Sequence, residues 1–280
     1  MNIKVISDST CDLSPELVQA NDITITPLIV MKNGEEFYDG QTIVPNDIFA
    51  HVAAGGELCT TAARSVGFYV DTFRPFAEKY DGVVHITISS DFSSSFQNAT
   101  LAASEFDNVL VVDSRNLSTG QGLLVLKACA LAKTVSSLDE LKTALEDYSS
   151  KVEASFVVDK LDYLVKGGRC SSAAALGANL LNLKPCIEVR DGKMIVGKKY
   201  RGKFAKCLAS YVTDRLEGRE DIDQSVLFIT YTQVSQEVLD AVREAVRTYG
   251  RFSEIYETVA GCTVSCHCGP GTLGILFARK

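Results

Sequence analysis

The sequence of 280 residues predicts an α/β protein with two α/β domains, the first over residues 1–155 and the second over residues 156–280. Strand and helix signals alternate through the first half, which predicts a mostly parallel sheet with right-handed crossovers. The second half contains a hairpin signal, which predicts a mixed or antiparallel sheet. No internal repeat or low-complexity linker separates the halves, so we expect them to pack closely, with a ligand pocket at or near their junction.

The elements of the first domain follow from the spacing of apolar residues and from turn residues. Pro15 opens a short helix after Ser14, and residues 32–35 supply a turn. Pro75 falls inside an expected helix and should kink or shorten it. We expect strands at residues 3–7, 23–30, 83–89 and 109–112, and helices at residues 66–80, 93–106 and 120–133.

The second domain has a different pattern. Asp191-Gly192 lies between two strand-like segments and predicts the turn of a β-hairpin. A regular apolar stripe predicts a helix at residues 235–248. The remaining expected elements are strands at residues 154–158, 185–189, 194–198, 226–231, 255–259 and 273–278, and a helix at residues 203–216.

Composition and charge exclude several classes of function. The net charge of −7 and the pI of about 5.1 argue against a nucleic-acid partner, because binding to a phosphate backbone requires clustered cations. Residues 1–7 lead directly into a strand-like segment without the apolar region of a signal peptide. No apolar stretch reaches the 18 residues that would span a bilayer. We therefore expect a cytoplasmic protein with at most transient membrane contact.

Nine cysteines in a chain of this length favour free thiols in a reducing compartment. Cys262, Cys266 and Cys268 surround His267, and this cluster suggests a zinc-binding regulatory module as one hypothesis. The spacing differs from paired C-x2-C ligands, and a strand would point these side chains to alternate faces. We therefore expect no metal and no cofactor.

Two aspartates follow expected strands, Asp8 after the first and Asp113 after the strand at residues 109–112. Ligands collect beyond the carboxyl ends of parallel strands, so both aspartates could take part in chemistry. Each could equally cap a turn or the next helix, and capping is the interpretation that the sequence favours.

Hydroxyl side chains gather in two other segments. Residues 89–95 contain five serines between a strand and a helix, where free N–H groups favour an anion, although a serine-rich helix cap would look the same. Thr60 and Thr61 form a second hydroxyl pair with no evident structural task. His267 precedes a Gly-Pro-Gly turn that should fix its orientation, and a neutral-pH imidazole can donate to a carboxylate or phosphate.

Arg169 and Arg201 each lie beside glycines, and basic residues dominate the segment 191–206. This segment is either a solvated basic face or a surface that handles phosphate or docks a partner, because arginine binds oxyanions in a bidentate manner.

Taken together, these segments resemble the DegV family over residues 3–278. The motifs that carry the resemblance, in order along the chain, are Ser7–Leu13, Ser89–Ala99, Val112–Ser114 with Gly120 and Gly122, Leu164–Arg169, Leu176-Gly177 through Lys184-Pro185, Lys199–Gly202 and His267–Thr272.

The resemblance implies two α/β domains with a long-chain fatty acid buried near their junction. It also implies that the protein is a carrier and not an enzyme by itself. Family members present the acyl chain to a separate fatty acid kinase catalytic subunit, which phosphorylates the carboxylate for phospholipid synthesis. The implied head-group ligands are Thr60 or Thr61, Ser93 and His267, and Arg169 and Arg201 match arginines associated with phosphoryl transfer or kinase docking.

The sequence departs from the family pattern at two ligand loops. Ala62-Ala63 stands where the family usually has Gln-Pro, and Ser94 stands where it usually has glycine. Both changes could alter the head-group pocket.

The alternative function is a hydrolase or phosphotransferase that uses Asp8 or Asp113 with His267, although the sequence has no G-x-S-x-G elbow, Walker loop or dinucleotide fingerprint. Acyl chain length, unsaturation and oligomeric state stay open.

Overall fold

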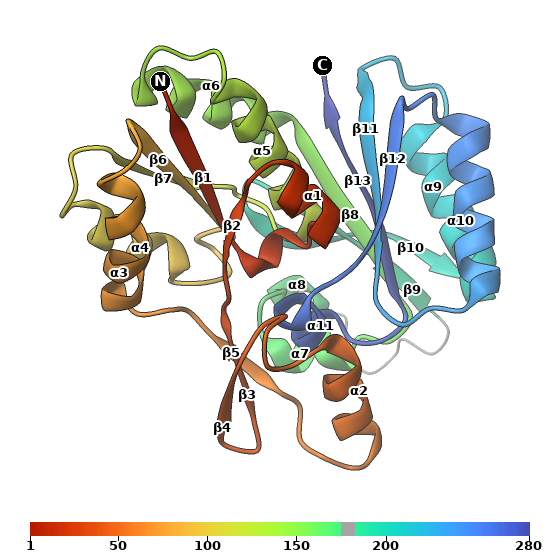
Figure 1. The fold of residues 1–280 in the computed structure, drawn as a ribbon. Coiled ribbons are helices and arrows are strands. Elements are labelled where there is room, and N and C mark those ends of the chain that lie inside the picture. The colour runs from red at the N-terminus through yellow and green to blue at the C-terminus, as the bar shows by residue number, and fades with distance from the viewer. Residues whose placement is uncertain (175–182) are drawn as a thin grey trace.

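Residues 3–8 form an inner strand of a four-stranded parallel sheet in the computed structural model, which describes residues 1–174 and 183–280 (Figure 1). In spatial order the strands are β2 (Thr24–Thr26), β1 (Ile3–Asp8), β6 (Gly82–Thr87) and β7 (Val109–Asp113). The helical elements of this part are η1 (Ser9–Cys11), α1 (Pro15–Ala20), α3 (Val66–Ala77), α4 (Ser95–Ala103), α5 (Ser118–Leu131) and α6 (Leu138–Lys151). The predicted parallel sheet is therefore confirmed.

Both faces of this sheet are covered by helices, because its strands alternate apolar residues between the two sides. Ile6 and Val83 pack with α3 and α4, whereas Val5 and Val84 pack with α5 and α6. Helix α3 runs through Pro75 and ends at Ala77, three residues earlier than expected.

The expected strand at residues 23–30 is wrong as a single element. Pro27 lacks the N–H that a strand ladder needs, so the segment divides into β2 and β3 (Ile29–Lys32), which belong to different sheets. Strand β3 lies between β4 (Glu35–Tyr38) and β5 (Thr60–Ala62) in a small antiparallel sheet that the sequence analysis missed. Helix α2 (Pro45–Ala53) and helix α6 were also missed, although Ser137 caps α6 by accepting from the N–H of Glu140.

The second sheet has six strands and is mixed, as predicted. Its spatial order is β10 (Lys193–Arg201), β9 (Leu183–Arg190), β8 (Val152–Val158), β13 (Thr272–Arg279), β11 (Ile222–Tyr231) and β12 (Glu254–Val259). The hairpin at Asp191-Gly192 joins β9 to β10. Because β8 begins at Val152, the expected boundary between residues 155 and 156 falls inside this strand.

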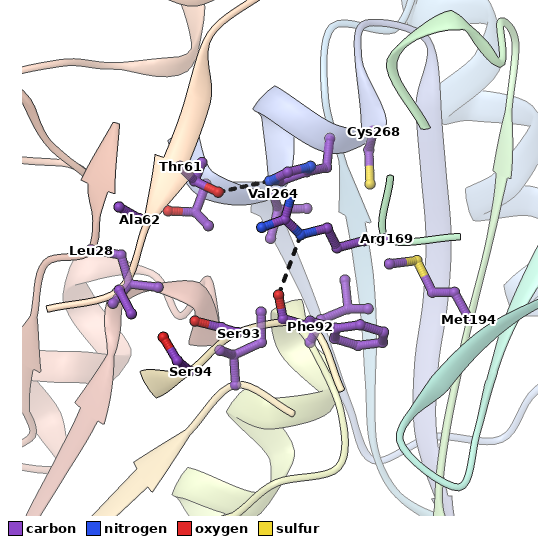
Figure 2. A pocket seen from close by; sticks show the side chains of 15 residues that line it. Leu28, Thr61, Ala62, Phe92, Ser93, Ser94, Arg169, Met194, Val264 and Cys268 are labelled. Atoms are coloured by element: carbon purple, nitrogen blue, oxygen red, sulfur yellow. Dashed lines mark hydrogen bonds between the residues drawn. The ribbon is translucent and has the colours of Figure 1, made fainter. Parts of the chain in front are cut away.

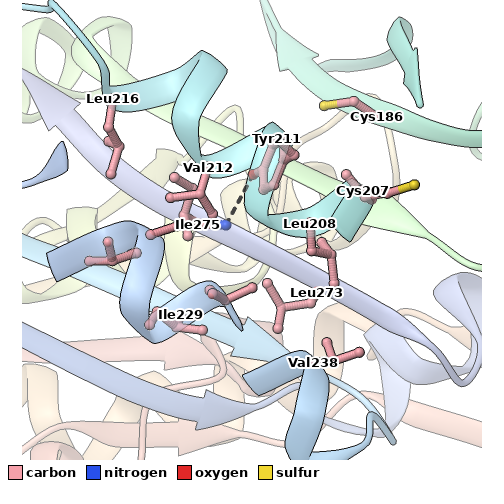
Figure 3. Close-up of a cluster of buried hydrophobic side chains, with 14 of the residues drawn as sticks. Cys186, Cys207, Leu208, Tyr211, Val212, Leu216, Ile229, Val238, Leu273 and Ile275 are labelled. Atoms are coloured by element: carbon pink, nitrogen blue, oxygen red, sulfur yellow. Dashed lines mark hydrogen bonds between the residues drawn. The ribbon is translucent and has the colours of Figure 1, made fainter. Parts of the chain in front are cut away.

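Helices α9 (Phe204–Leu216) and α10 (Gln236–Tyr249) cover one face of the second sheet (Figure 3). Tyr211 lies fully buried in this layer, where its hydroxyl donates to the carbonyl of Ser155 at 2.7 Å and accepts from the N–H of Ile275 at 3.1 Å. Within residues 1–174 and 183–280, the remaining helices are α7 (Asp162–Gly167), α8 (Ser171–Ala174) and α11 (Cys262–Cys268).

Helix α5 lies between the two sheets (Figure 1). Leu124 packs into the core of the parallel sheet, whereas the adjacent Leu123 packs against β8, β11 and β13 of the mixed sheet. A helix that contacts apolar surface on both sides must be apolar around most of its circumference, which is the pattern of α5. This helix makes the junction between the two sheets a packed interface.

Gly122 permits the close approach of α5 to the loop after β1. A Cβ atom at residue 122 would lie 2.7 Å from the backbone oxygen of Cys11. We expect Gly122→Ala to lower the free energy of unfolding by about 1–3 kcal/mol, because the overpacking outweighs the gain in helix propensity. Urea unfolding followed by circular dichroism measures this change.

Gly67 provides the matched control in α3, where a Cβ atom would meet no atom within 4 Å. Gly67→Ala should raise the free energy of unfolding by about 0.5–1 kcal/mol. Equal stabilisation by both substitutions would contradict the tight contact at Gly122.

Candidate functional site

A cavity of about 360 Å³ lies where the small antiparallel sheet, the β6–α4 loop and α11 meet. Figure 2 shows hydroxyl side chains of Thr61, Ser93 and Ser94 on one side of this cavity and Phe92 and Met194 on the opposite side. Its larger apolar lining residues are Leu28, Ile88, Phe92, Leu117, Met194, Val264 and Cys268. The volume is within the range of small-molecule pockets, and the lining combines an apolar wall with a few polar groups.

Helix α11 carries two polar residues of the lining, and its position depends on two aspartates near the start of the chain. The N–H of Gly261 donates to Asp12 Oδ1 at 2.9 Å, and the N–H groups of Cys262 and Thr263 donate to Asp39 at 2.7 and 3.1 Å. These carboxylates satisfy the first N–H groups of the helix, which have no partner within the helix itself. Burial raises the pKa of Asp12 to about 8, with a further contribution from Asp39.

His267 lies in the cavity lining at hydrogen-bond distance from a predicted ligand residue. Its Nε2 is 2.8 Å from Thr61 Oγ1, and the imidazole tautomer decides which of the two donates. The ring packs so tightly on Gly167 that a Cβ atom there would lie 2.6 Å from Nδ1. Burial, together with the positive charge of Arg169, lowers the pKa of His267 to about 4, so the imidazole is neutral at pH 7.

Ser93 lies in the same lining, in the loop between β6 and α4. Its Oγ accepts from the N–H of Ser95 at 3.2 Å and is 2.9 Å from Ser95 Oγ, which holds the side chain in one position. Ser94 has φ −77° and ψ 5°, a conformation that any L-residue can adopt. The replacement of the usual family glycine by Ser94 therefore strains nothing in this loop.

The structure brings together only part of the predicted set. Thr61, Ser93, His267 and Arg169 line the cavity, whereas Thr60 and Arg201 do not. Thr60 is exposed on β5, because adjacent residues of a strand point to opposite faces. Arg201 is exposed at the end of β10. Arg169 is exposed at the rim, where Nη1 donates to the carbonyl of Gly167 at 3.0 Å and Nε donates to the carbonyl of Phe92 at 3.4 Å (Figure 2).

Ala62 and Ala63, which replace the usual Gln-Pro of the family, also line the cavity. The chain that follows them stays close to α4, because Asn98 donates from Nδ2 to the carbonyl of Arg64 at 2.8 Å. The Arg64 guanidinium lies 3.7 Å from the centre of the Phe68 ring. These contacts fix the path of the loop in the absence of the proline.

Asp8 and Asp113 lie outside the cavity lining, and each has a structural role. Asp8 is fully buried and accepts hydrogen bonds from Thr26, Tyr69 and the N–H of Ile88 at 3.0–3.2 Å. Asp113 accepts from Ser90 and from the N–H of Arg115 in a turn. The capping interpretation fits Asp113, whereas the Asp8 side chain makes no cap hydrogen bond and instead joins β1 to neighbouring elements. The geometry does not bring either carboxylate to His267.

The expectation that a strand contains Cys262, Cys266 and Cys268 is wrong. These residues form α11, because Asp12 and Asp39 supply the acceptors that its first N–H groups need. Cys262 and Cys266 pack with Cys59 in one apolar cluster, whereas Cys268 packs in another. Among the residues that the structure describes, no group of three histidine, cysteine or acidic side chains is arranged to hold a metal ion.

Thr263 is a candidate ligand that the sequence analysis missed. It is 5% exposed and lines the cavity, and its Oγ1 has no hydrogen-bond partner among the described residues. Thr263 precedes His267 by four residues, so both side chains face the same side of α11. Interpretation of this segment as a helix would have revealed the pair.

The motif from Leu176-Gly177 to Lys184-Pro185 lies largely outside the described residues. In the part of the chain that is described, no helix is long and apolar enough to cross a membrane.

The comparisons with known proteins agree with one another over the full length of the chain. A family model described as "Uncharacterised protein, DegV family" matches residues 2–280. Protein DegV of Bacillus subtilis is 31% identical, with 100% of both chains covered. The structure is similar to that of a fatty-acid-binding DegV family protein from Thermus thermophilus, with a TM-score of 0.91, 30% identity and 100% of both chains covered. It is also similar to a stearic-acid-binding protein from Eubacterium ventriosum, with a TM-score of 0.85, 27% identity and coverage of 99% and 98%.

The environment of His267 leads to a prediction about its protonation. We expect an NMR titration of this imidazole, one of only three in the chain, to show a midpoint near pH 4. Arg169→Gln should raise the pKa of His267, because the substitution removes a positive charge that opposes protonation. The imidazole signal that is missing from the spectrum of the His267→Asn variant is the signal of His267.

Lys166→Gln is the control, because it removes a positive charge from α7, just before Arg169, and leaves Arg169 in place. It should leave the midpoint unchanged. A midpoint near 6.5 in the unmodified protein would contradict the buried position of the imidazole.

Proposed function

The chain belongs to the DegV family, and from this membership we propose that it binds a long-chain fatty acid in the cavity beside α11. The observation that carries the proposal is that one cavity combines an apolar wall with Thr61, Ser93 and His267. Relatives of the same fold are described as fatty-acid-binding proteins, which supports the same ligand class.

The carboxylate of the ligand needs hydrogen-bond donors, because an unpaired anion in a buried site costs several kcal/mol. We assign the Nε2–H tautomer to the neutral His267, because in that form the ring donates to Thr61 Oγ1 and leaves the Thr61 O–H group free to point at a carboxylate oxygen. Ser93 supplies a second hydroxyl, and we assign the unpartnered hydroxyl of Thr263 to the same head-group region. Arg169 at the rim supplies the positive charge.

The acyl chain supplies the affinity. Burial contributes about 0.8 kcal/mol per methylene, so a sixteen-carbon chain contributes on the order of 10 kcal/mol before the costs of association. Leu28, Ile88, Phe92 and Met194 provide apolar contact for the methylenes nearest the carboxylate.

In this proposal the protein is a carrier that acts in the cytoplasm, where nine free cysteines suit the reducing conditions. A separate kinase subunit phosphorylates the carboxylate that the carrier presents at the cavity rim. The exposed guanidinium of Arg169 is suited to a bidentate contact with the transferred phosphate. Arg201 does not line the cavity, and we assign it to docking of the kinase.

Organic extraction of the natively purified protein should yield about one fatty acid per chain by mass spectrometry. Thr61→Val should weaken binding of added fatty acid about tenfold, because one hydroxyl donor to the carboxylate is lost. Displacement of a fluorescent fatty acid measures the affinity.

Thr60→Val is the matched control, since it makes the same change on the exposed face of β5. It should leave the affinity unchanged. The proposal fails if extraction yields no fatty acid and the delipidated protein also binds none that is added.

The kinase step has its own test, in which acyl phosphate formation is measured with the kinase catalytic subunit and ATP. With the carrier saturated by fatty acid, Arg169→Gln should lower the maximal rate at least tenfold, so that any loss of fatty-acid affinity does not account for the change. Arg201→Gln should raise the concentration of carrier needed for half-maximal rate without lowering the maximal rate. Unchanged kinetics in both variants would remove these arginines from the step.

A further inference from the structure

A second, smaller cavity of about 30 Å³ adjoins the ligand cavity on the side of the mixed sheet. Three side chains line both spaces, namely Leu117, Val264 and Cys268, and each is at least 93% buried. Thr61, Ser93, His267 and Arg169 line only the larger cavity. The three shared side chains therefore separate the head-group cavity from a deeper space that has no charged side chain in its wall.

Helix α11 explains this arrangement by its periodicity. Thr263 and His267 are four residues apart and form a polar stripe along the helix. Val264 and Cys268 each follow one of these residues directly and form an apolar stripe beside the polar one. One short helix therefore supplies head-group ligands and part of the partition. Leu117, which immediately precedes α5, completes the partition from the opposite side.

The hydroxyl groups of the three threonines in the wall of the smaller cavity are engaged in hydrogen bonds with other residues. Thr232 donates to the carbonyl of Gly269 and Thr272 donates to the carbonyl of Cys268, both at 2.9 Å. Thr230 is 2.6 Å from the hydroxyl of Thr119. A bound water needs two to four polar partners, so this space favours methylene groups over water.

We propose that Leu117, Val264 and Cys268 set the upper limit of acyl chain length by closing the ligand cavity against the smaller one. This inference rests on the proposed fatty-acid binding and adds which residues select among chain lengths. The end of a longer acyl chain would have to enter the space between Phe156, Ala260 and Leu276, and the partition blocks it.

Leu117→Ala removes three carbon atoms from the partition and joins the two cavities. We expect the optimum in a series of saturated fatty acids from twelve to twenty-two carbons to move up by about two carbons. Each added methylene that becomes buried should increase the affinity about fourfold, so the longest acids should gain more than tenfold relative to the unmodified protein. Val264→Ala should move the optimum in the same direction.

Leu28→Ala is the matched control, because it deletes the same atoms from a buried residue that lines only the ligand cavity. It should weaken binding at all lengths without favouring the longest acids. Circular dichroism and thermal unfolding establish that each variant is folded.

A second control fills the smaller cavity from its far wall. Ala260 lines only that space, so Ala260→Val should leave the length profile of the unmodified protein unchanged. The same substitution should cancel the gain in a Leu117→Ala background.

The inference is overturned if Leu117→Ala and Val264→Ala bind fatty acid with the same length profile as Leu28→Ala. It is also overturned if Ala260→Val has no effect on the Leu117→Ala variant. Failure of every variant and of the unmodified protein to bind any fatty acid would instead refute the proposed function.

Discussion

Two buried carboxyl groups from the first forty residues hold the N-terminus of a helix that lies more than 220 residues later in the chain. Asp12 and Asp39 accept the N–H groups of residues 261–263, and this contact sets the register of α11. The alignment of His267 with Thr61 follows from that register, because a rotation of α11 by one residue would turn the imidazole about 100° from β5. The geometry of the site therefore depends on a helix cap that joins the two ends of the sequence.

Helix α5 has the complementary role of joining the two sheets. Adjacent leucines at 123 and 124 pack into different sheets, so neither sheet can shift without disturbing the other. Leu117, the residue that precedes this helix, lines the cavity. The packed interface that α5 forms between the two sheets therefore ends at the cavity, so residues from both sides of the interface can line one pocket.

Much of this architecture could be predicted from the sequence, because strand and helix periodicity depends on local patterns. The parallel sheet, the hairpin at residues 191–192 and most helices arise in this way. Helix α11 could not be predicted, since its cysteine-rich sequence has a weak pattern and its capping groups are remote. The sequence also could not distinguish Thr60 from Thr61, because the face that each presents depends on how β5 pairs with β3.

The position of β13 has a consequence for the order in which the protein folds. This strand contains nearly the last residues of the chain, yet it lies between β8 and β11 near the middle of the mixed sheet. The parallel sheet, in contrast, has all of its strands by residue 113. During synthesis the first sheet can therefore assemble early, whereas β8 and β11 must wait on the ribosome with unpaired edges until the final strand emerges. A chain without residues 272–279 would lack the strand between β8 and β11, whereas all the strands of the parallel sheet would be present.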